Sequence, residues 1–194
     1  MKARFGVEPF ASLSHFVDLI CEATLAQNLI SPSTVDTIWS RHVVDSAQLI
    51  ELAGPTGTWV DVGTGGGFPG VVVAILRRQR TIMVEPRRLR ADFLTTVART
   101  LGLANAEIVA RKVEAVADPA AVISARAVGS VEKLLRAAST CATTSTRWLL
   151  PRGHLDQAEL TSLRARWAGE FHVKQSITDA ASSILVIDGA ELRR

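Results

Sequence analysis

An acidic residue followed closely by a run of glycines occupies residues 61–70, which read Asp-Val-Gly-Thr-Gly-Gly-Gly-Phe-Pro-Gly. Apolar residues before the glycines predict a strand, and the apolar run at 71–76 predicts a helix after them. Glycine adopts positive φ and has no side chain to keep a ligand from the backbone. The first turn of the helix offers unpaired N–H groups. This order of elements predicts a binding site for a nucleotide-like ligand.

The glycines fit two arrangements. Gly65, Gly67 and Gly70 have the spacing of the dinucleotide fingerprint, in which a pyrophosphate lies on the helix N-terminus. Alternatively, Asp61 precedes glycines at alternate positions from Gly63, and a carboxylate there attracts an ammonium group but repels a pyrophosphate. S-adenosylmethionine carries an amino-acid group and a sulfonium charge but no phosphate, so Asp61 favours this cofactor over NAD. A glycine turn without any ligand is the remaining alternative.

Two further strand ends carry chemistry. Glu85 ends the second predicted strand, where an acid accepts hydrogen bonds from the ribose hydroxyls of an adenosine. This position serves NAD and S-adenosylmethionine equally, and an ion pair with Arg87 or Arg88 is the alternative. The loop after the third predicted strand is expected to border the adenine, with Val113 over the face of the ring.

The fourth predicted strand ends in Ser124-Ala125-Arg126-Ala127. Methylation of exocyclic amines uses a polar-Pro-Pro-aromatic motif at this place, and methylation of C5 uses a cysteine; neither is present here. Arg126 can hold a base edge or a phosphate but cannot remove a proton, because its pKa exceeds about 12. An acceptor with no proton to lose, such as N7 of guanine, suits this site. A structural ion pair of Arg126 is the alternative.

The elements expected around these residues alternate between strand and helix. Strands are predicted at 58–62, 81–85, 106–110, 121–125 and 147–150, and helices at 68–78, 88–101, 130–140 and 155–167. Alternation predicts a mainly parallel, doubly wound α/β sheet with helices on both faces. The closing strands, 170–175 and 183–188, have a connection too short for a parallel crossover, so we expect an antiparallel hairpin. This Rossmann-like layout is typical of S-adenosylmethionine-dependent methyltransferases, and a dehydrogenase would require a further catalytic domain.

Helical periodicity at 10–28 and 31–52 predicts an N-terminal helical extension, residues 1–54, packed on a methyltransferase domain, residues 55–194. Among the 194 residues, 47% are hydrophobic and the mean hydropathy is +0.21, which excludes a disordered chain. We see neither a membrane-length apolar run nor a secretory signal. Cys21 and Cys141 are expected to be buried thiols, and the four histidines lack the spacing of zinc ligands. A cytoplasmic location is expected.

The basic residues are biased toward arginine. Of the 22 basic residues 18 are Arg, although the net charge is only +3. Six arginines gather between positions 77 and 90 against a single acid, Glu85. Arginine binds phosphates and stacks on bases, so this segment predicts a contact with RNA, with a solvated helix end as the alternative.

Taken together, residues 41–46 (Arg-His-Val-Val-Asp-Ser), 61–70 and 124–127 resemble the bacterial 16S ribosomal RNA guanine-N7 methyltransferase family, also called glucose-inhibited division protein B or methyltransferase G. The resemblance covers roughly residues 28–153, and the Phe-Pro-Gly ending at 68–70 is its most specific part. It implies transfer of a methyl group from S-adenosylmethionine to N7 of a guanine in the 530 loop of 16S rRNA, with the rRNA or a small-subunit particle as partner. No metal and no membrane are implied, and a monomer is favoured.

The resemblance also implies roles for single residues. The cofactor would be bound by Gly63, Phe68, Glu85, Val113, Glu114 and Arg126, and the acidic glycine turn described above adds Asp61 and Gly65. Arg126 would in addition orient the target base. The RNA would be contacted by Arg41, His42, Arg88, Arg90 and Arg152, of which Arg152 replaces a lysine of the family. A small-molecule methyltransferase and a non-catalytic RNA-binding module on the same fold are the alternative functions.

Overall fold

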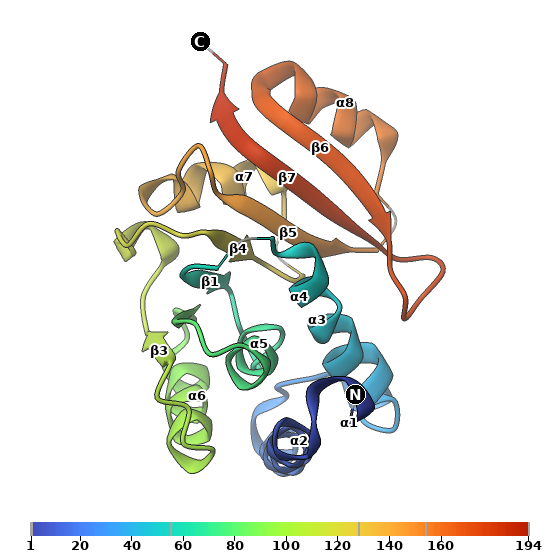
Figure 1. Ribbon diagram of the computed structural model, residues 1–194, viewed down its shortest axis with the longest axis vertical. Coiled ribbons are helices and arrows are strands. Elements are labelled where there is room, and N and C mark those ends of the chain that lie inside the picture. The colour runs from blue at the N-terminus through green and yellow to red at the C-terminus, as the bar shows by residue number, and fades with distance from the viewer. Residues whose placement is uncertain (1, 55, 128, 154, 194) are drawn as a thin grey trace.

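The computed structural model describes residues 2–54, 56–127, 129–153 and 155–193, and within them seven strands form one sheet (Figure 1). The strand order is β3-β2-β1-β4-β5-β7-β6. The strands are β1 (Trp59–Val62), β2 (Thr81–Val84), β3 (Ala106–Val109), β4 (Val122–Ser124), β5 (Arg147–Arg152), β6 (Trp167–Gln175) and β7 (Ser183–Leu192). β1 to β5 are parallel, whereas β7 is antiparallel to both β5 and β6. The predicted doubly wound sheet with a closing antiparallel hairpin is confirmed.

Helices cover both faces of this sheet. They are α1 (Lys2–Phe5), α2 (Val7–Gln27), α3 (Asp45–Ala47), α4 (Leu49–Leu52), α5 (Gly70–Leu76), α6 (Arg88–Thr100), α7 (Val131–Ala137) and α8 (Gln157–Arg166). One core cluster joins the sheet to α7 and α8, and a second joins it to α2, α5 and α6. Figure 1 shows α1 to α6 gathered on one side of the molecule, and α8 packed on the long β6–β7 hairpin.

The side chains of β1 alternate between the two faces of the sheet. Val60 and Val62 are buried in the cluster that contains α7 and α8. Trp59 is buried against Val73 of α5 on the opposite face. Successive side chains of a strand point to opposite faces, so Asp61 lies on the α5 side, beneath the N-terminus of that helix.

The sheet has its topological switch point at β1, which pairs with β2 on one side and with β4 on the other. In open α/β sheets the ligand crevice lies outside the carboxyl ends of the strands at this point. The glycine turn follows β1 and the loop with Arg126 follows β4, so the fold brings these two predicted segments to one crevice.

The N-terminal region differs in part from the prediction. The helix expected at 10–28 is confirmed as α2, but the single helix expected at 31–52 is a broken series. It consists of a 3₁₀ turn (Pro32–Thr34), a π-helical stretch (Trp39–Val44), α3 and α4. Side chains of α2, such as Phe16 and Ile20, share a core with α5. The predicted boundary between residues 54 and 55 falls on Pro55, outside the described residues, and the division into two domains stays a prediction.

Within the described ranges, none of the helices combines the length and apolar character needed to cross a membrane. Cys21 and Cys141 are both free thiols, the former half-buried and the latter buried. Burial raises the pKa of each.

Candidate active site

The glycine turn after β1 is built for two purposes. Gly63 and Gly65 have φ of 72° and 59° and remain partly exposed. A Cβ placed on Gly65 would be in ordinary contact, 3.7 Å from Arg90 Nη1 and from the Gly63 carbonyl oxygen, so this side of the turn is not crowded. By contrast, a Cβ on Gly66 would lie 2.9 Å from Ile20, and one on Gly67 would lie 2.7 Å from Phe16. The turn therefore faces the crevice with its first glycines and packs against α2 with the next two.

Asp61 connects the segments around the crevice through hydrogen bonds of its buried carboxylate. Its side chain is fully buried; Oδ1 accepts a 2.6 Å hydrogen bond from Ser124 Oγ, and Oδ2 accepts one of 2.9 Å from Gly70 N. Ser124 in turn accepts a 2.7 Å bond from Trp59 Nε1. Burial raises the pKa of Asp61 to about 6, although these hydrogen bonds and Arg126 act in the opposite direction. Asp61 thus joins β1, β4 and the start of α5, and its direct contact with a ligand stays a prediction.

Glu85 lies at the same turn. It is buried, and its two carboxylate oxygens accept hydrogen bonds from Gly65 N (3.0 Å) and Arg87 N (2.9 Å). The alternative of a side-chain ion pair with Arg87 or Arg88 is not what the structure shows, because Glu85 bonds the backbone of Arg87. A carboxylate oxygen has two lone pairs, so each oxygen keeps the capacity to accept from a ribose hydroxyl.

The predicted adenine loop is a 3₁₀ turn, Val113–Ala115. Val113 is buried in the core cluster with α7, and its carbonyl accepts a 3.5 Å bond from Thr140 Oγ1. Glu114 is exposed. Their contact with an adenine stays a prediction.

Arg126, Phe68 and His42 form a layered group beside the turn. The Arg126 guanidinium carbon lies 5.2 Å from the centroid of the Phe68 ring. His42 stacks on Phe68 with centroids 5.0 Å apart and an interplanar angle of 28°. The cation–π contact and the ring stacking hold these three side chains together in one group.

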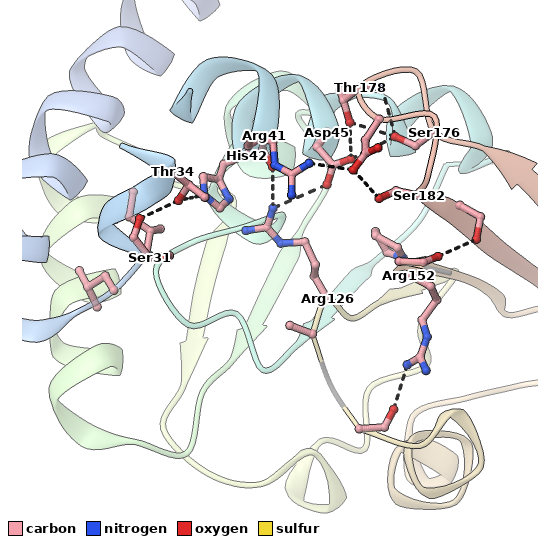
Figure 2. Close-up of a pocket in the computed structure, with 18 of the residues that line it drawn as sticks. Ser31, Thr34, Arg41, His42, Asp45, Arg126, Arg152, Ser176, Thr178 and Ser182 are labelled. Atoms are coloured by element: carbon pink, nitrogen blue, oxygen red, sulfur yellow. Dashed lines mark hydrogen bonds and ion pairs between the residues drawn. The ribbon is translucent and has the colours of Figure 1, made fainter. Parts of the chain in front are cut away.

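A pocket of about 820 Å³ opens beyond Arg126 and is called the Arg126 pocket here. Figure 2 shows Arg126 reaching from the end of β4 toward Arg41 and Asp45. Its Nη1 donates to the Arg41 carbonyl at 3.3 Å and lies 3.6 Å from Asp45 Oδ2. Burial lowers the pKa of Arg126, while Asp45 and Asp61 act against this shift. Arg126 therefore lies between the glycine turn and the pocket.

The loop between β6 and β7 forms the far wall of the Arg126 pocket. Gln48 Oε1 accepts from Ile177 N at 3.0 Å, Asp45 Oδ1 accepts from Thr178 Oγ1 at 2.9 Å, and Arg41 Nη1 donates to Asp179 Oδ2 at 2.8 Å. These contacts tie the N-terminal helices to the closing hairpin. Sequence reasoning missed this wall, and its only signal was Asp45 within the motif at 41–46.

His42 is neutral at ordinary pH. Burial, and then the charges of Arg126 and Arg41, lower its pKa to about 4. Its Nε2 lies 2.8 Å from Thr34 Oγ1, and its Nδ1 is buried without a hydrogen-bond partner among the described residues. Its packing on Phe68 makes His42 a support of the cofactor side of the site, and a contact with RNA stays a prediction.

The arginines predicted to contact RNA fall into two groups. Arg41 and Arg152 line the Arg126 pocket. Arg152 Nη1 donates to the Gly129 carbonyl at 2.9 Å, and its Nη2 lies 3.5 Å from Glu159. Arg88 and Arg90 lie instead on the first turn of α6, on the other side of the glycine turn; the Arg88 side chain is 92% exposed.

The six arginines at 77–90 do not form one patch. Arg77, Arg78 and Arg80 precede β2 and the others follow it, so the strand separates the two sets. Arg77 is buried against Trp59, and Arg80 pairs with Glu107 and Asp118. Only the second set lies at the crevice end of the sheet.

Comparison with known proteins assigns the chain to a family. The family model described as rRNA small subunit methyltransferase G (GidB) matches residues 10–185. The chain belongs to this family. A relative with the same family name from Sphingopyxis alaskensis is 45% identical over 187 residues, covering 95% of this chain and 80% of the relative. Another, from Novosphingobium aromaticivorans, is 42% identical and covers 90% of this chain and 78% of the relative.

Solved structures support the same fold. An O-methyltransferase from Bacillus cereus in complex with SAH has a TM-score of 0.61 at 12% identity, covering 92% of this chain and 90% of that one. A putative S-adenosyl-L-methionine-dependent methyltransferase from Methanococcus maripaludis has the same TM-score at 12% identity, covering 83% and 93%. The predicted family and the S-adenosylmethionine-dependent methyltransferase class are confirmed for this member of the methyltransferase G family.

Proposed function

We propose that this protein transfers the methyl group of S-adenosylmethionine to N7 of one guanine in the 530 loop of 16S rRNA. The observation that carries the proposal is the position of Arg126, which packs on Phe68 of the glycine turn and lines the Arg126 pocket. One side of this guanidinium thus belongs to the predicted cofactor site and the other to a cavity large enough for a nucleotide base. The family membership supports rRNA as the substrate class.

The cofactor fits the residues at the turn. Gly63 and Gly65 are partly exposed at the crevice, and the Glu85 carboxylate beside them can accept ribose hydroxyls. Asp61 would act by fixing the start of α5 through Gly70 N. Val113 and Glu114 would border the adenine. When bound, S-adenosylmethionine supplies an electrophilic methyl carbon on a sulfonium, whose C–S electron pair returns to sulfur as the new N–C bond forms.

The acceptor chemistry matches the side chains of the pocket. Guanine N7 has an in-plane lone pair and no proton, so it needs no general base, and the pocket places an arginine at the end of β4. The role of Arg126 is then to orient the base, because alignment of the reacting atoms supplies much of such a rate enhancement. Arg41 and Arg152 at this pocket, and Arg88 and Arg90 at α6, would bind the phosphates around the target. His42 lines the same pocket, and its neutral ring would contact the RNA without pairing with a phosphate charge.

A small-molecule methyltransferase is the second candidate, and the size of the Arg126 pocket favours it. Purified protein with radiolabelled S-adenosylmethionine separates the two candidates. The acceptors are small-subunit particles from a strain that lacks the gene, and free guanosine as a control. We expect the label in 16S rRNA alone, at one guanine. Label in guanosine but not in rRNA would contradict the proposal, and absence of cofactor binding would favour a non-catalytic RNA-binding module in the cytoplasm.

A further inference from the structure

Asp45 is a carboxylate held in a fixed orientation at the wall of the Arg126 pocket. Its Oδ1 accepts three hydrogen bonds, from Gln48 Nε2 (2.8 Å), Thr178 Oγ1 (2.9 Å) and Ser176 Oγ (3.4 Å). These donors come from the N-terminal helices and from the β6–β7 loop, which lie far apart in the sequence. Three donors on one oxygen leave the side chain no freedom to rotate, so the direction of the second oxygen is set as well.

The second oxygen, Oδ2, faces Arg126. Its charged neighbour is Arg126 Nη1 at 3.6 Å, which is longer than an ordinary hydrogen bond. Arg126 is thus a long, weak donor to Oδ2, and this oxygen keeps a further lone pair with which to accept a hydrogen bond. The Asp45 side chain is 15% exposed, and Figure 2 shows it beside Arg126 at the pocket. A partly exposed carboxylate oxygen with spare acceptor capacity, next to a guanidinium, is suited to a ligand that presents N–H donors.

Guanine presents such donors. Its Watson–Crick edge carries N1–H and the N2 amino group beside the O6 acceptor, whereas adenine has an unprotonated N1 there, which a carboxylate repels. Single-stranded or flipped bases are read on this edge. N7 lies on the opposite side of the ring system, so a contact at the Watson–Crick edge leaves the methyl acceptor free.

We infer that Asp45 selects the target base by accepting a hydrogen bond from the N2 amino group of guanine at Oδ2. This inference rests on the proposed function and adds to it the residue that decides guanine over other bases. Asp45 is a specificity residue in this account, while Arg126 orients the base.

The pocket contains a natural control carboxylate. Asp179 also lines it, but both of its oxygens already accept short hydrogen bonds: Oδ2 from Arg41 Nη1 (2.8 Å) and Ser182 Oγ (3.0 Å), and Oδ1 from Ala181 N (2.9 Å). These contacts hold the β6–β7 loop in place. The substitution Asp179→Asn therefore weakens the pocket wall without touching the proposed reader of the base.

Asp45→Asn is the informative substitution because its geometry is predictable. The three donors at Oδ1 require an oxygen there, so the amide of the variant would place its NH₂ group where Oδ2 now lies. The atom facing the base would change from acceptor to donor at nearly constant shape. The N2 amino group of guanine would then meet another donor.

The test compares guanosine with inosine, which lacks only the N2 amino group. 16S rRNA is ligated so that the target position holds either nucleoside, assembled into small-subunit particles, and methylated by each variant. For the wild type we expect kcat/KM on inosine to be lower by about 10- to 100-fold, the value of one hydrogen bond to a charged group. For Asp45→Asn we expect the guanosine-to-inosine ratio to fall to about one or below, and for Asp179→Asn we expect the wild-type ratio.

Each contrary outcome has a distinct meaning. Equal wild-type activity on guanosine and inosine would overturn the role of Asp45 and leave the proposed function intact. An unchanged ratio in Asp45→Asn, with both rates reduced, would show that Asp45 only supports the loop. Failure of the wild type on both particles would contradict the proposed function itself.

A second variant guards against a folding defect in Asp45→Asn. Thr178→Val removes one donor to Oδ1 and keeps the carboxylate, so we expect a lower kcat/KM with the wild-type ratio retained. Calorimetric binding of S-adenosylmethionine to every variant reports whether the cofactor side is folded. A ratio near one in Thr178→Val as well would assign the discrimination to the loop and overturn the inference.

Discussion

The guanidinium carbon of Arg126 lies over the Phe68 ring, 5.2 Å from its centroid. This contact joins the residue predicted to orient the base to the residue predicted to line the cofactor. Because His42 stacks on the same ring, the N-terminal helices, the glycine turn and the loop after β4 share one packed group. A change at Arg126 should therefore affect alignment more than cofactor binding.

Arg126→Lys tests this relationship. Lysine keeps the charge but loses the planar group that packs on Phe68 and reaches Asp45, so we expect kcat to fall about 100-fold, as for misplacement of reacting groups. Calorimetric affinity for S-adenosylmethionine should change by less than about 10-fold. Arg136→Lys is the matched control, since Arg136 also lies over an aromatic ring, that of Trp167 at 5.8 Å, but away from the crevice. Equal losses of kcat in both variants would contradict the assignment.

Glu85→Ala tests the ribose site. The carboxylate orders the turn through Gly65 N and is proposed to accept the ribose hydroxyls. We expect the affinity for S-adenosylmethionine to fall about 10- to 100-fold, because hydrogen bonds to a charged group are lost. Isothermal titration calorimetry measures this, with Glu22→Ala on the exposed surface of α2 as control. An affinity unchanged from the wild type would remove Glu85 from the site.

Gly67→Ala tests the packing of the turn on α2. Gly67 has φ of +105°, and a Cβ there would lie 2.7 Å from Phe16. Gly102 also has positive φ, +63°, but no heavy atom lies within 4 Å of its added Cβ. Gly102→Ala should cost only backbone strain, about 1 kcal/mol, whereas Gly67→Ala adds overpacking of about 1–3 kcal/mol. Urea unfolding of both variants measures the difference in their free energies of unfolding. Equal losses would show that α2 shifts to accommodate the added methyl group without cost.

His42 gives a prediction for pH. Its pKa is lowered to about 4 from the ordinary 6.5, so between these values the unfolded chain binds a proton that the folded protein does not. Protonation of His42 in the unfolded chain therefore lowers the free energy of unfolding as the pH falls from 6.5 toward 4, and it has no effect above pH 6.5. An NMR titration, with the resonance assigned by His42→Gln, should give a midpoint near 4. A midpoint of 6 or higher would mean that the ring is open to water.

The sequence predicts the frame of the site well because its signals are local. The alternation of strands and helices predicts the parallel sheet, and Asp61, Glu85 and Arg126 belong to three of its predicted strand ends. The observed strand order brings these ends to one crevice. Local signals do not report partners that are far apart in the chain. Thr178 bonds Asp45 across 133 positions, and nothing in the Ser-Ile-Thr-Asp segment predicts that contact.

The glycines show the same limit. A glycine-rich turn predicts a ligand, yet Gly66 and Gly67 lack side chains because α2 occupies that space. Only the packing of a distant helix reveals this second reason. The π-helical stretch at Trp39–Val44, which presents Arg41 and His42, is likewise not predicted by the periodicity of its own residues, and His42 packs it on Phe68 of the turn.

Methylation of a single guanine in 16S rRNA can be read from mass spectrometry of that rRNA. The rRNA is taken from the parent strain, from a strain with the gene deleted, and from the deletion strain carrying either the wild-type gene or the Arg126→Lys variant. We expect N7-methylguanine at one position of the 530 loop to disappear on deletion, to return with the wild-type gene and to return only in part with the variant. A guanine that keeps its methyl group in the deletion strain would contradict the account.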